Sequence, residues 1–180
     1  MGREGKYIIR GKPGSGKSTA AMMVKERLEN LGVKVGGIRT PEVRSGGRRI
    51  GFEVEDLLTG ERVLFASVNY RNGPRISKYG VRIDLFEKVA IPALENSMRE
   101  CDLVLVDEIG KMELFSDRFV EVVRELWRSD RAALGTAPIS KIKFVEEICS
   151  LSEVFWIERG MAERVAEKLV ERILRYLGRL

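Results

Sequence analysis

The stretch Gly11-Lys12-Pro13-Gly14-Ser15-Gly16-Lys17-Ser18 decides the fold of this chain, because it matches the phosphate-loop pattern G-x-x-x-x-G-K-[ST] without a mismatch. Glycines in such a loop let successive backbone N–H groups turn inward around an anion, and the following helix adds the positive end of its dipole. Lys17 would place its charge on the β- and γ-phosphates, Ser18 would offer a hydroxyl to Mg²⁺, and Thr19 would touch the α-phosphate. The sequence therefore predicts a nucleotide-binding loop.

The residues on either side of this loop favour the strand and the helix that it needs. Residues 7–10 form a short β-favouring run. From Lys17 to Leu31 apolar residues recur at helical spacing, and Gly32 marks the expected helix end. Residues 33–38 have the composition of a second strand. Together these segments predict a βαβ unit.

An acidic pair, Asp107-Glu108, directly follows the apolar run Leu103-Val104-Leu105-Val106. Such a run is typical of a strand buried on both faces, and its carboxyl end lies at the ligand-binding edge of a parallel sheet. There Asp107 would hold Mg²⁺ through a water molecule, and Glu108 would polarise a water aimed at the γ-phosphate. A kinase needs no such glutamate, because its acceptor is a substrate hydroxyl or phosphate. The pair therefore favours hydrolysis.

The rest of the chain alternates helical and strand-like segments, which predicts an α/β fold with a mostly parallel sheet in one domain over residues 1–180. We expect Asp84 to cap a helix that runs to about residue 98 and bends near Pro92. Further helices are expected over 116–127, 140–148 and from 160, and strands over 131–135 and 154–157. Turns at residues 45–47 and 58–61 predict an antiparallel hairpin insertion over about 41–68, followed by a flexible loop over about 69–80.

Several other polar side chains are weaker candidates for the site. Glu113 is a reserve candidate for water activation, although a surface charge is the preferred interpretation. Thr136 follows a predicted strand and either contacts the γ-phosphate or the attacking water, or is an ordinary strand end. Each of five arginines is either a solvent-facing charge or an arginine finger, and their spacing does not choose among them. These are Arg39, Arg44, Arg48, Arg49 and Arg159.

Composition excludes several classes of protein. Hydrophobic residues make up 44% of the 180 residues and charged residues 33%, so a core under an ionised surface is expected. The chain contains no histidine, which excludes imidazole catalysis and histidine-ligated metals. It has no apolar run long enough for a transmembrane helix and no secretory signal at its start.

Cysteine use and charge indicate the setting of the protein. Cys101 and Cys149 lack the C-x-x-C spacing and are expected to be buried or half-buried free thiols in a reducing cytoplasm. Trp127 and Trp156 lie on apolar faces and are expected in the core, with base stacking as the less favoured alternative for either. Glutamine is absent while Lys, Arg and Glu are abundant, a bias reported for hyperthermophile proteins. The net charge of +5 is compatible with an attraction for polyanions but also with a merely ionised surface.

Four segments carry a resemblance to a known family. They are the loop at 11–19, the string Gly36-Gly37-Ile38-Arg39-Thr40-Pro41-Glu42-Val43-Arg44 with Arg49-Ile50-Gly51-Phe52, the string Lys78-Tyr79-Gly80-Val81, and residues 103–113 with the distinctive Asp-Glu-Ile-Gly-x-Met-Glu order. In this order they resemble the cancer-related, thermophile-type nucleoside-triphosphatase family, from Tyr7 to about Leu177. The likeness is weaker after the last predicted strand, near Arg159.

The resemblance implies a RecA-like core of the additional-strand, catalytic-glutamate type. It also implies a Mg²⁺-dependent hydrolase that converts ATP, GTP, CTP and UTP to diphosphates with weak preference among bases. By motif match, Gly11 to Ser18 would bind phosphates and a second segment would contact the nucleotide. That segment is Leu103, Val104, Leu105, Val106, Asp107, Glu108, Ile109 and Gly110. Lys17 and Glu108 would be catalytic, and Ser18 and Asp107 would hold the metal.

Two other functions stay open from the sequence. The chain could be a nucleotide or small-molecule kinase in which residues 69–80 cover the acceptor. It could also be a switch linked to nucleic acid, which the arginines of the first hairpin motivate although no base-reading motif supports it. The sequence predicts no membrane partner and sets no oligomeric state.

Overall fold

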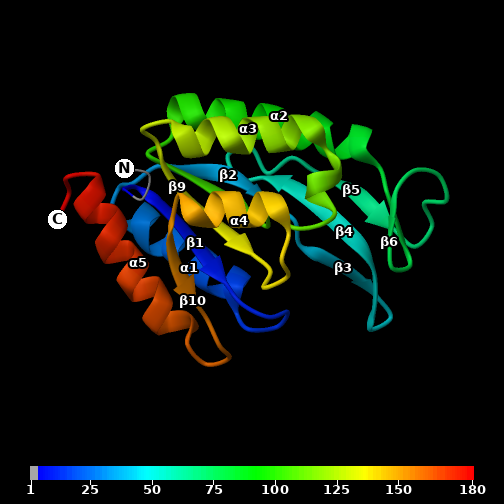
Figure 1. The fold of residues 1–180 in the computed structure, drawn as a ribbon, viewed down its shortest axis with the longest axis horizontal. Helices are drawn as coiled ribbons and strands as arrows, with labels where there is room; N and C mark the ends of the chain where they lie inside the picture. Colours follow the sequence, from blue (N-terminus) through cyan, green and yellow to red (C-terminus); the bar gives the residue numbers. More distant parts are fainter. Residues whose placement is uncertain (1–3) are drawn as a thin grey trace.

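A ten-stranded sheet runs through the computed structural model, which describes residues 4–180, and helices lie against the sheet (Figure 1). The strands are β1 (Lys6–Arg10), β2 (Val35–Arg39), β3 (Glu42–Ser45), β4 (Arg48–Asp56), β5 (Arg62–Ser67), β6 (Arg75–Ile76), β7 (Tyr79–Val81), β8 (Leu103–Asp107), β9 (Ala132–Ala137) and β10 (Glu153–Trp156). The helices are α1 (Lys17–Asn30), α2 (Ile83–Glu100), α3 (Asp117–Arg128), α4 (Lys143–Ser150) and α5 (Ala162–Tyr176), with a 3₁₀ turn at Glu113–Phe115.

The half of the sheet that holds the phosphate loop is parallel. Its strands lie in the order β10-β1-β9-β8-β2, so β9 separates the strand before the phosphate loop from the strand before the acidic pair. This is the additional-strand arrangement, and it confirms the predicted α/β class. Because all five strands point the same way, the loops that follow β1, β8 and β9 meet at one edge.

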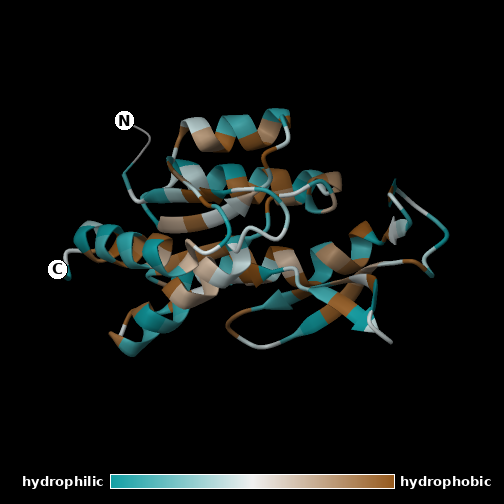
Figure 2. Cartoon of the chain, turned by 90° about the horizontal axis from the view of Figure 1, so that it is seen from below, coloured by the Kyte–Doolittle hydropathy of each residue, from teal (hydrophilic) through white to brown (hydrophobic). Residues whose placement is uncertain are grey.

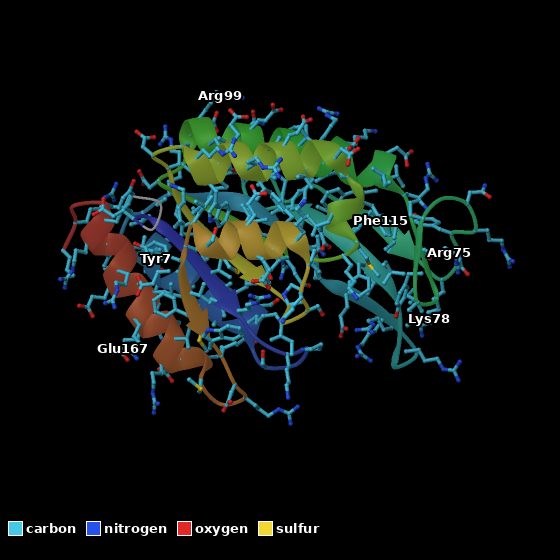
Figure 3. The ribbon with its side chains drawn as sticks, viewed as in Figure 1. Tyr7, Arg75, Lys78, Arg99, Phe115 and Glu167 are labelled. Carbon is cyan, nitrogen blue, oxygen red and sulfur yellow. The ribbon has the colours of Figure 1, made fainter. Side chains whose placement is uncertain are left out.

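The other half of the sheet is antiparallel and grows from the edge of β2. β4 pairs with β2 at one end and with β3 at the other, and β5, β7 and β6 follow outward. The two predicted turns are therefore present, but the hairpins extend the main sheet instead of lying beside it. Figure 3 shows the side chains of Arg75 and Lys78 at the outer end of this extension, where both are exposed.

The prediction of a loop over residues 69–80 is wrong for its second part. Tyr79–Val81 forms strand β7, which pairs with β5, and Arg75–Ile76 pairs with β7 as β6. The Tyr79 and Val81 side chains are buried in the same cluster as Phe65 and Phe86. The segment looks polar along the sequence because only its alternate residues face the core.

Helices cover both faces of the parallel half. Ile9 of β1 packs in the cluster formed with α1 and α5, and Ile8 packs in the cluster that contains residues of α2, α3 and α4. A strand covered on both faces has no solvent side, so every residue of β1 and β8 is buried instead of every second one. The helices carry both hydrophobic and hydrophilic residues along their length, as Figure 2 shows, because one side meets the sheet and the other meets water.

Helix α3 lies close to the predicted range 116–127, whereas the start of α2 differs from the prediction. Ser116 caps α3, because its hydroxyl accepts a hydrogen bond from the Phe119 N–H at 3.0 Å. The expected capping role of Asp84 is wrong: α2 begins at Ile83, and the Asp84 carboxylate accepts a hydrogen bond from Arg82 at 2.7 Å instead. Pro92 lies inside α2, which continues to Glu100 without interruption.

Replacing Gly37 with alanine should destabilise the sheet strongly. Gly37 in β2 has φ +110°, and a methyl group there would lie 1.9 Å from the Leu105 carbonyl oxygen in β8. We expect Gly37→Ala to cost about 3 kcal/mol or more, which corresponds to a fall in Tm of roughly 10 °C. Thermal unfolding followed by circular dichroism measures this.

Gly46→Ala is the matched control. Gly46 also has a positive φ, of +57°, but nothing lies within 4 Å of the added methyl group. It should therefore cost only about 1 kcal/mol, from the left-handed backbone alone. Equal losses in the two variants would contradict the close approach of β2 and β8.

Candidate active site at the carboxyl ends of the parallel strands

The phosphate loop links the end of β1 to the start of α1 as a tight turn. The Ser15 N–H donates to the Lys12 carbonyl oxygen at 3.1 Å, and Gly14 and Gly16 have positive φ values of +76° and +100°. α1 then begins at Lys17 with no acidic residue in its first turn. The free N–H groups and the positive end of the helix dipole therefore face the loop with no carboxylate of α1 itself to compete.

The side chains of Lys17 and Ser15 in this loop have polar groups that a bound anion could contact. The Lys17 ammonium donates to the carbonyl oxygens of Gly11 and Lys12 at 2.8 and 3.1 Å, and its burial lowers its pKa. Within residues 4–180, the buried hydroxyl of Ser15 has no hydrogen-bond partner. A buried polar atom without a partner is costly, and a bound phosphate oxygen would supply one.

The carboxylate of Asp107 joins three elements at one point. Its Oδ1 atom accepts a hydrogen bond from the Ser18 hydroxyl of α1 at 3.1 Å and from the Thr136 hydroxyl of β9 at 2.5 Å. The Asp107 carbonyl oxygen accepts from the Thr40 N–H at 2.7 Å. Burial raises the pKa of Asp107, and the two hydroxyl donors oppose that rise. Thr136 is therefore part of the site and not an ordinary strand end.

Glu108 and Glu113 lie next to this point. Glu108 is half-buried, and its pKa is raised by burial, while the neighbouring charge of Lys17 works against the rise. The peptide bond between Asp107 and Glu108 is cis. Glu108 is close enough to Lys17 for the two charges to influence each other.

The preferred interpretation of Glu113 as a surface charge is wrong. The 3₁₀ turn that starts at Glu113 folds its side chain inward, where it accepts a hydrogen bond from the Gly110 N–H at 3.0 Å. Glu113 is only 5% exposed, and burial together with the nearby Glu108 raises its pKa to about 8. At neutral pH Glu113 therefore carries a proton, which makes it a poor acceptor for another.

The strand part of the segment 103–110, which is predicted to contact the nucleotide, has buried side chains. Leu103, Val104, Leu105 and Val106 are fully buried in the two core clusters. The Ile109 side chain is also buried, and its N–H donates to the Thr136 carbonyl oxygen at 2.9 Å. These residues position Asp107 and Glu108, which are the parts of the segment that reach the site.

The five candidate arginines differ in their ion pairs and in their position relative to the phosphate loop. Arg39 pairs with Asp107 in the β2–β8 register, and its side chain is bound to Glu55 of β4. Arg44 and Arg49, on the first hairpin, both pair with Glu42. Arg159 lies beside the phosphate loop, since a methyl group on Gly14 would lie 4.0 Å from its Nη2 atom. Arg48 is the exposed first residue of β4, directly after the turn of the first hairpin.

The expected core position of Trp156 is wrong, whereas that of Trp127 is confirmed. Trp127 is buried as predicted and donates to the Ser152 hydroxyl at 2.8 Å, but Trp156 is 59% exposed. With Ile139, it lines a hollow of about 460 Å³ beside residues 11–15 of the phosphate loop. In the β1–β10 register Trp156 pairs with Arg10, which directly precedes the loop.

The donors at the loop fit a magnesium ion. Mg²⁺ prefers hard oxygen ligands and is usually held by one or two protein groups together with substrate phosphates and water. The Ser18 hydroxyl and the Asp107 carboxylate are such donors and lie 3.1 Å apart. Within the described part of the chain, no group of three or more Asp, Glu or Cys side chains is arranged to hold a metal by itself. Ser18 and Asp107 therefore fit an ion that arrives with the nucleotide.

The chain is similar in sequence to proteins of a known family. Residues 6–172 match the NTPase family. The chain is 54% identical to nucleoside-triphosphatase THEP1 of Korarchaeum cryptofilum over 96% of this chain and 89% of the relative. The chain belongs to the THEP1 nucleoside-triphosphatase family. It is therefore a hydrolase of nucleoside triphosphates, as the resemblance in the sequence implied.

Solved THEP1 structures have the same fold. THEP1 from the hyperthermophile Aquifex aeolicus superposes with a TM-score of 0.82 at 33% identity, covering 93% of this chain and 98% of that one. A human cancer-related nucleoside triphosphatase gives a TM-score of 0.80 at 35% identity, covering 96% of this chain and 98% of that one. The RecA-like THEP1 fold predicted here is thus confirmed. Among the helices at residues 4–180, none combines the length and the apolar character needed to cross a membrane.

The buried Glu113 should make stability fall as pH rises. Its folded-state pKa of about 8 lies above the usual glutamate value of 4.5, so the folded protein holds a proton that the unfolded chain has lost. This contribution is fully present below pH 4.5 and is lost as the pH rises through 8. Glu113→Gln, which cannot ionise, should remove that loss, as urea unfolding at pH 5.5, 7 and 9 would show.

Glu121→Gln on the exposed face of α3 serves as the control and should follow the wild-type pH profile. If the Glu113→Gln and wild-type profiles run parallel from pH 5.5 to 9, Glu113 is ionised in the folded protein.

Proposed function

We propose that this chain hydrolyses ATP, GTP, CTP and UTP to the diphosphates and phosphate, with Mg²⁺ and with weak preference among the bases. The observation that carries the proposal is that the hydroxyls of Ser18 and Thr136 both donate hydrogen bonds to one carboxylate oxygen of Asp107. Glu108 directly follows Asp107 in the chain. This arrangement combines a metal-binding pair with a neighbouring base.

Binding of the triphosphate is assigned to the loop Gly11–Ser18 and Thr19. The backbone N–H groups and the start of α1 would surround the β- and γ-phosphates. Lys17 would exchange its two carbonyl partners for phosphate oxygens. The burial that lowers its pKa also strengthens its electrostatic attraction to an anion, because a partly desolvated charge is less screened by water. The Ser15 hydroxyl would obtain the partner that it lacks.

Ser18 and Asp107 would hold the metal, Ser18 directly and Asp107 through a water molecule. When bound, Mg²⁺ would supply positive charge to offset the negative charge that develops on the phosphate oxygens. Thr136 donates a hydrogen bond to the Asp107 oxygen, which orients the carboxylate and opposes the rise in its pKa.

Glu108 is the proposed base. Its carboxylate would accept a proton from a water molecule while the water oxygen forms a bond to the γ-phosphorus. The bond from the γ-phosphorus to the bridging oxygen breaks, and its electron pair stays on the diphosphate. Burial raises the pKa of Glu108 and makes it a stronger base, and the charge of Lys17 opposes that rise. The protonated Glu113 beside it adds no second negative charge.

Hydrolysis is favoured over phosphoryl transfer to a substrate. The names of the relatives describe nucleoside-triphosphatases, and a carboxylate placed for water activation suits the same reaction. The segment that would have covered a kinase acceptor is partly a paired strand, β7.

We also propose a cytoplasmic location and operation at high temperature. Cys101 is buried and Cys149 is half-buried, and both are free thiols, which suits a reducing compartment. THEP1 from Aquifex aeolicus is described as the protein of a hyperthermophile. The absence of glutamine in this chain points the same way.

Glu108→Gln should separate binding from hydrolysis. The amide keeps the shape of the side chain but cannot accept the proton from water, so the rate of phosphate release should fall by about 10²- to 10⁴-fold. Release from ATP, GTP, CTP and UTP with Mg²⁺ and no acceptor, at moderate and high temperature, measures this. Binding of each nucleotide should stay within a few-fold of wild type.

Glu61→Gln in an exposed turn of the extension is the control and should hydrolyse all four nucleotides at the wild-type rate. Full turnover by Glu108→Gln would move the base to another residue. Release from a single nucleotide only would contradict the proposed breadth.

Asp107→Asn should raise the concentration of Mg²⁺ that half-maximal activity requires. The substitution removes the charge that holds the metal water, and losses of about 10- to 100-fold in metal affinity are typical of such changes. Phosphate release is measured against Mg²⁺ concentration, and removal of the metal with a chelator should abolish it in both proteins. Asp130→Asn, exposed at the opposite edge of the sheet, should leave the Mg²⁺ curve unchanged.

A further inference from the structure

The position of the metal-binding pair sets a direction for the nucleotide, if the proposed function holds. Asp107 ends β8, which lies beyond β9 on one side of β1, and β10 lies on the other side of β1. The terminal phosphate belongs next to Ser18 and Asp107. A nucleotide cradled by the loop after β1 therefore extends its base away from β8, toward the end of β10.

A hollow is present where this direction leads. It has a volume of about 460 Å³ and is lined by residues 11–15 of the phosphate loop, by Ile139 after β9, and by residues 156–159 at the end of β10. This volume lies within the range of about 300–1,000 Å³ that small-molecule sites occupy. The hollow shares its wall with the loop, so a molecule bound by its phosphates can fill both.

The hollow has an apolar wall that is exposed to water. Within the described part of the chain, four large hydrophobic residues are exposed, and two of them, Trp156 at 59% and Ile139 at 42%, lie in this hollow. Their elements, β10 and the segment after β9, are separated by β1 in the sheet. An indole left open to solvent beside a phosphate site offers a flat face on which a base can stack.

The buried side chain of Arg10 holds this wall in place. Arg10 is only 5% exposed, and it donates to the carbonyl oxygens of Pro138 and Ser140 at 2.8 and 3.2 Å, on either side of Ile139. Its guanidinium carbon also lies 5.4 Å from the centre of the Trp156 ring, and its charge is paired with Glu146 at 2.5 Å. Arg10 directly precedes Gly11, so one residue fixes the wall relative to the loop.

We propose that this hollow receives the nucleobase, which stacks on the open face of Trp156 and packs against Ile139. Arg10 acts as a positioning residue beneath the indole. Stacking uses the π face that every base has, so it gains affinity from all four nucleotides without reading their edges. This deepens the proposed function, because it supplies a physical reason for weak base preference.

The test compares ligands that share the phosphate chain and differ in the base. The β,γ-methylene analogues of ATP and UTP, which cannot be hydrolysed at that bond, and inorganic triphosphate are titrated calorimetrically with Mg²⁺. Trp156→Ala should weaken binding of both analogues by roughly 10-fold, since stacking on an aromatic side chain has about this effect. Binding of inorganic triphosphate should change by less than about 2-fold. Trp156→Phe, which keeps an aromatic face, should restore most of the loss.

A spectroscopic readout accompanies the titration. In the wild type, the analogues should quench tryptophan fluorescence and inorganic triphosphate should not, and Trp156→Ala should lose this quenching because Trp127 is buried in the core. Leu31→Ala, another exposed apolar residue outside this hollow, is the matched control and should bind all three ligands as the wild type does.

The outcomes distinguish this inference from the proposed function. Equal affinity of Trp156→Ala and wild type for both analogues would overturn the stacking site while the phosphate site stands. An equal loss for inorganic triphosphate would also overturn it, because Trp156 would then act on the loop and not on the base. If the wild type binds neither the analogues nor inorganic triphosphate, the phosphate site fails and the inference fails with it.

Discussion

The carboxylate of Asp107 is the point on which the rest of the site depends. Removing a carboxylate from water is costly unless its oxygens accept hydrogen bonds, and here one oxygen accepts from both Ser18 and Thr136. Because these donors belong to α1 and β9, a shift of either element would leave the buried charge without a partner. The interaction that stabilises the buried end of β8 therefore also sets the distance between the phosphate loop and the acidic pair.

The two halves of the sheet contribute differently to this arrangement. The parallel half brings the ends of β1, β8 and β9 to one edge, where the loop and the carboxylates meet. The antiparallel half reaches the same edge through Glu55 of β4, which pairs with both Arg39 and Arg62. Arg39 lies next to Asp107 in the sheet, so the extension sets how much positive charge the site receives from that side.

The sequence predicted elements correctly where the pattern is local. It failed for side chains that could lie either in the core or in solvent. The apolar run before Asp107 could only be a buried strand, and it is one. Glu113 follows a turn whose direction the sequence does not give, so a carboxylate expected in water lies in the interior. Trp156 looked like a core residue, but Arg10 occupies the space beneath it and leaves the indole exposed.

The sequence by itself determined the phosphate loop, the order of helices and strands, the parallel core, and the placing of Asp107 and Glu108 after a buried strand. These follow from spacing, periodicity and glycine positions, which act between residues close together in the chain. Only the tertiary structure decided that Thr136 donates a hydrogen bond to Asp107, that residues 79–81 join the sheet, and that Trp156 and Ile139 line the same hollow. Those outcomes depend on the burial and pairing of residues far apart in the chain, which local patterns do not specify.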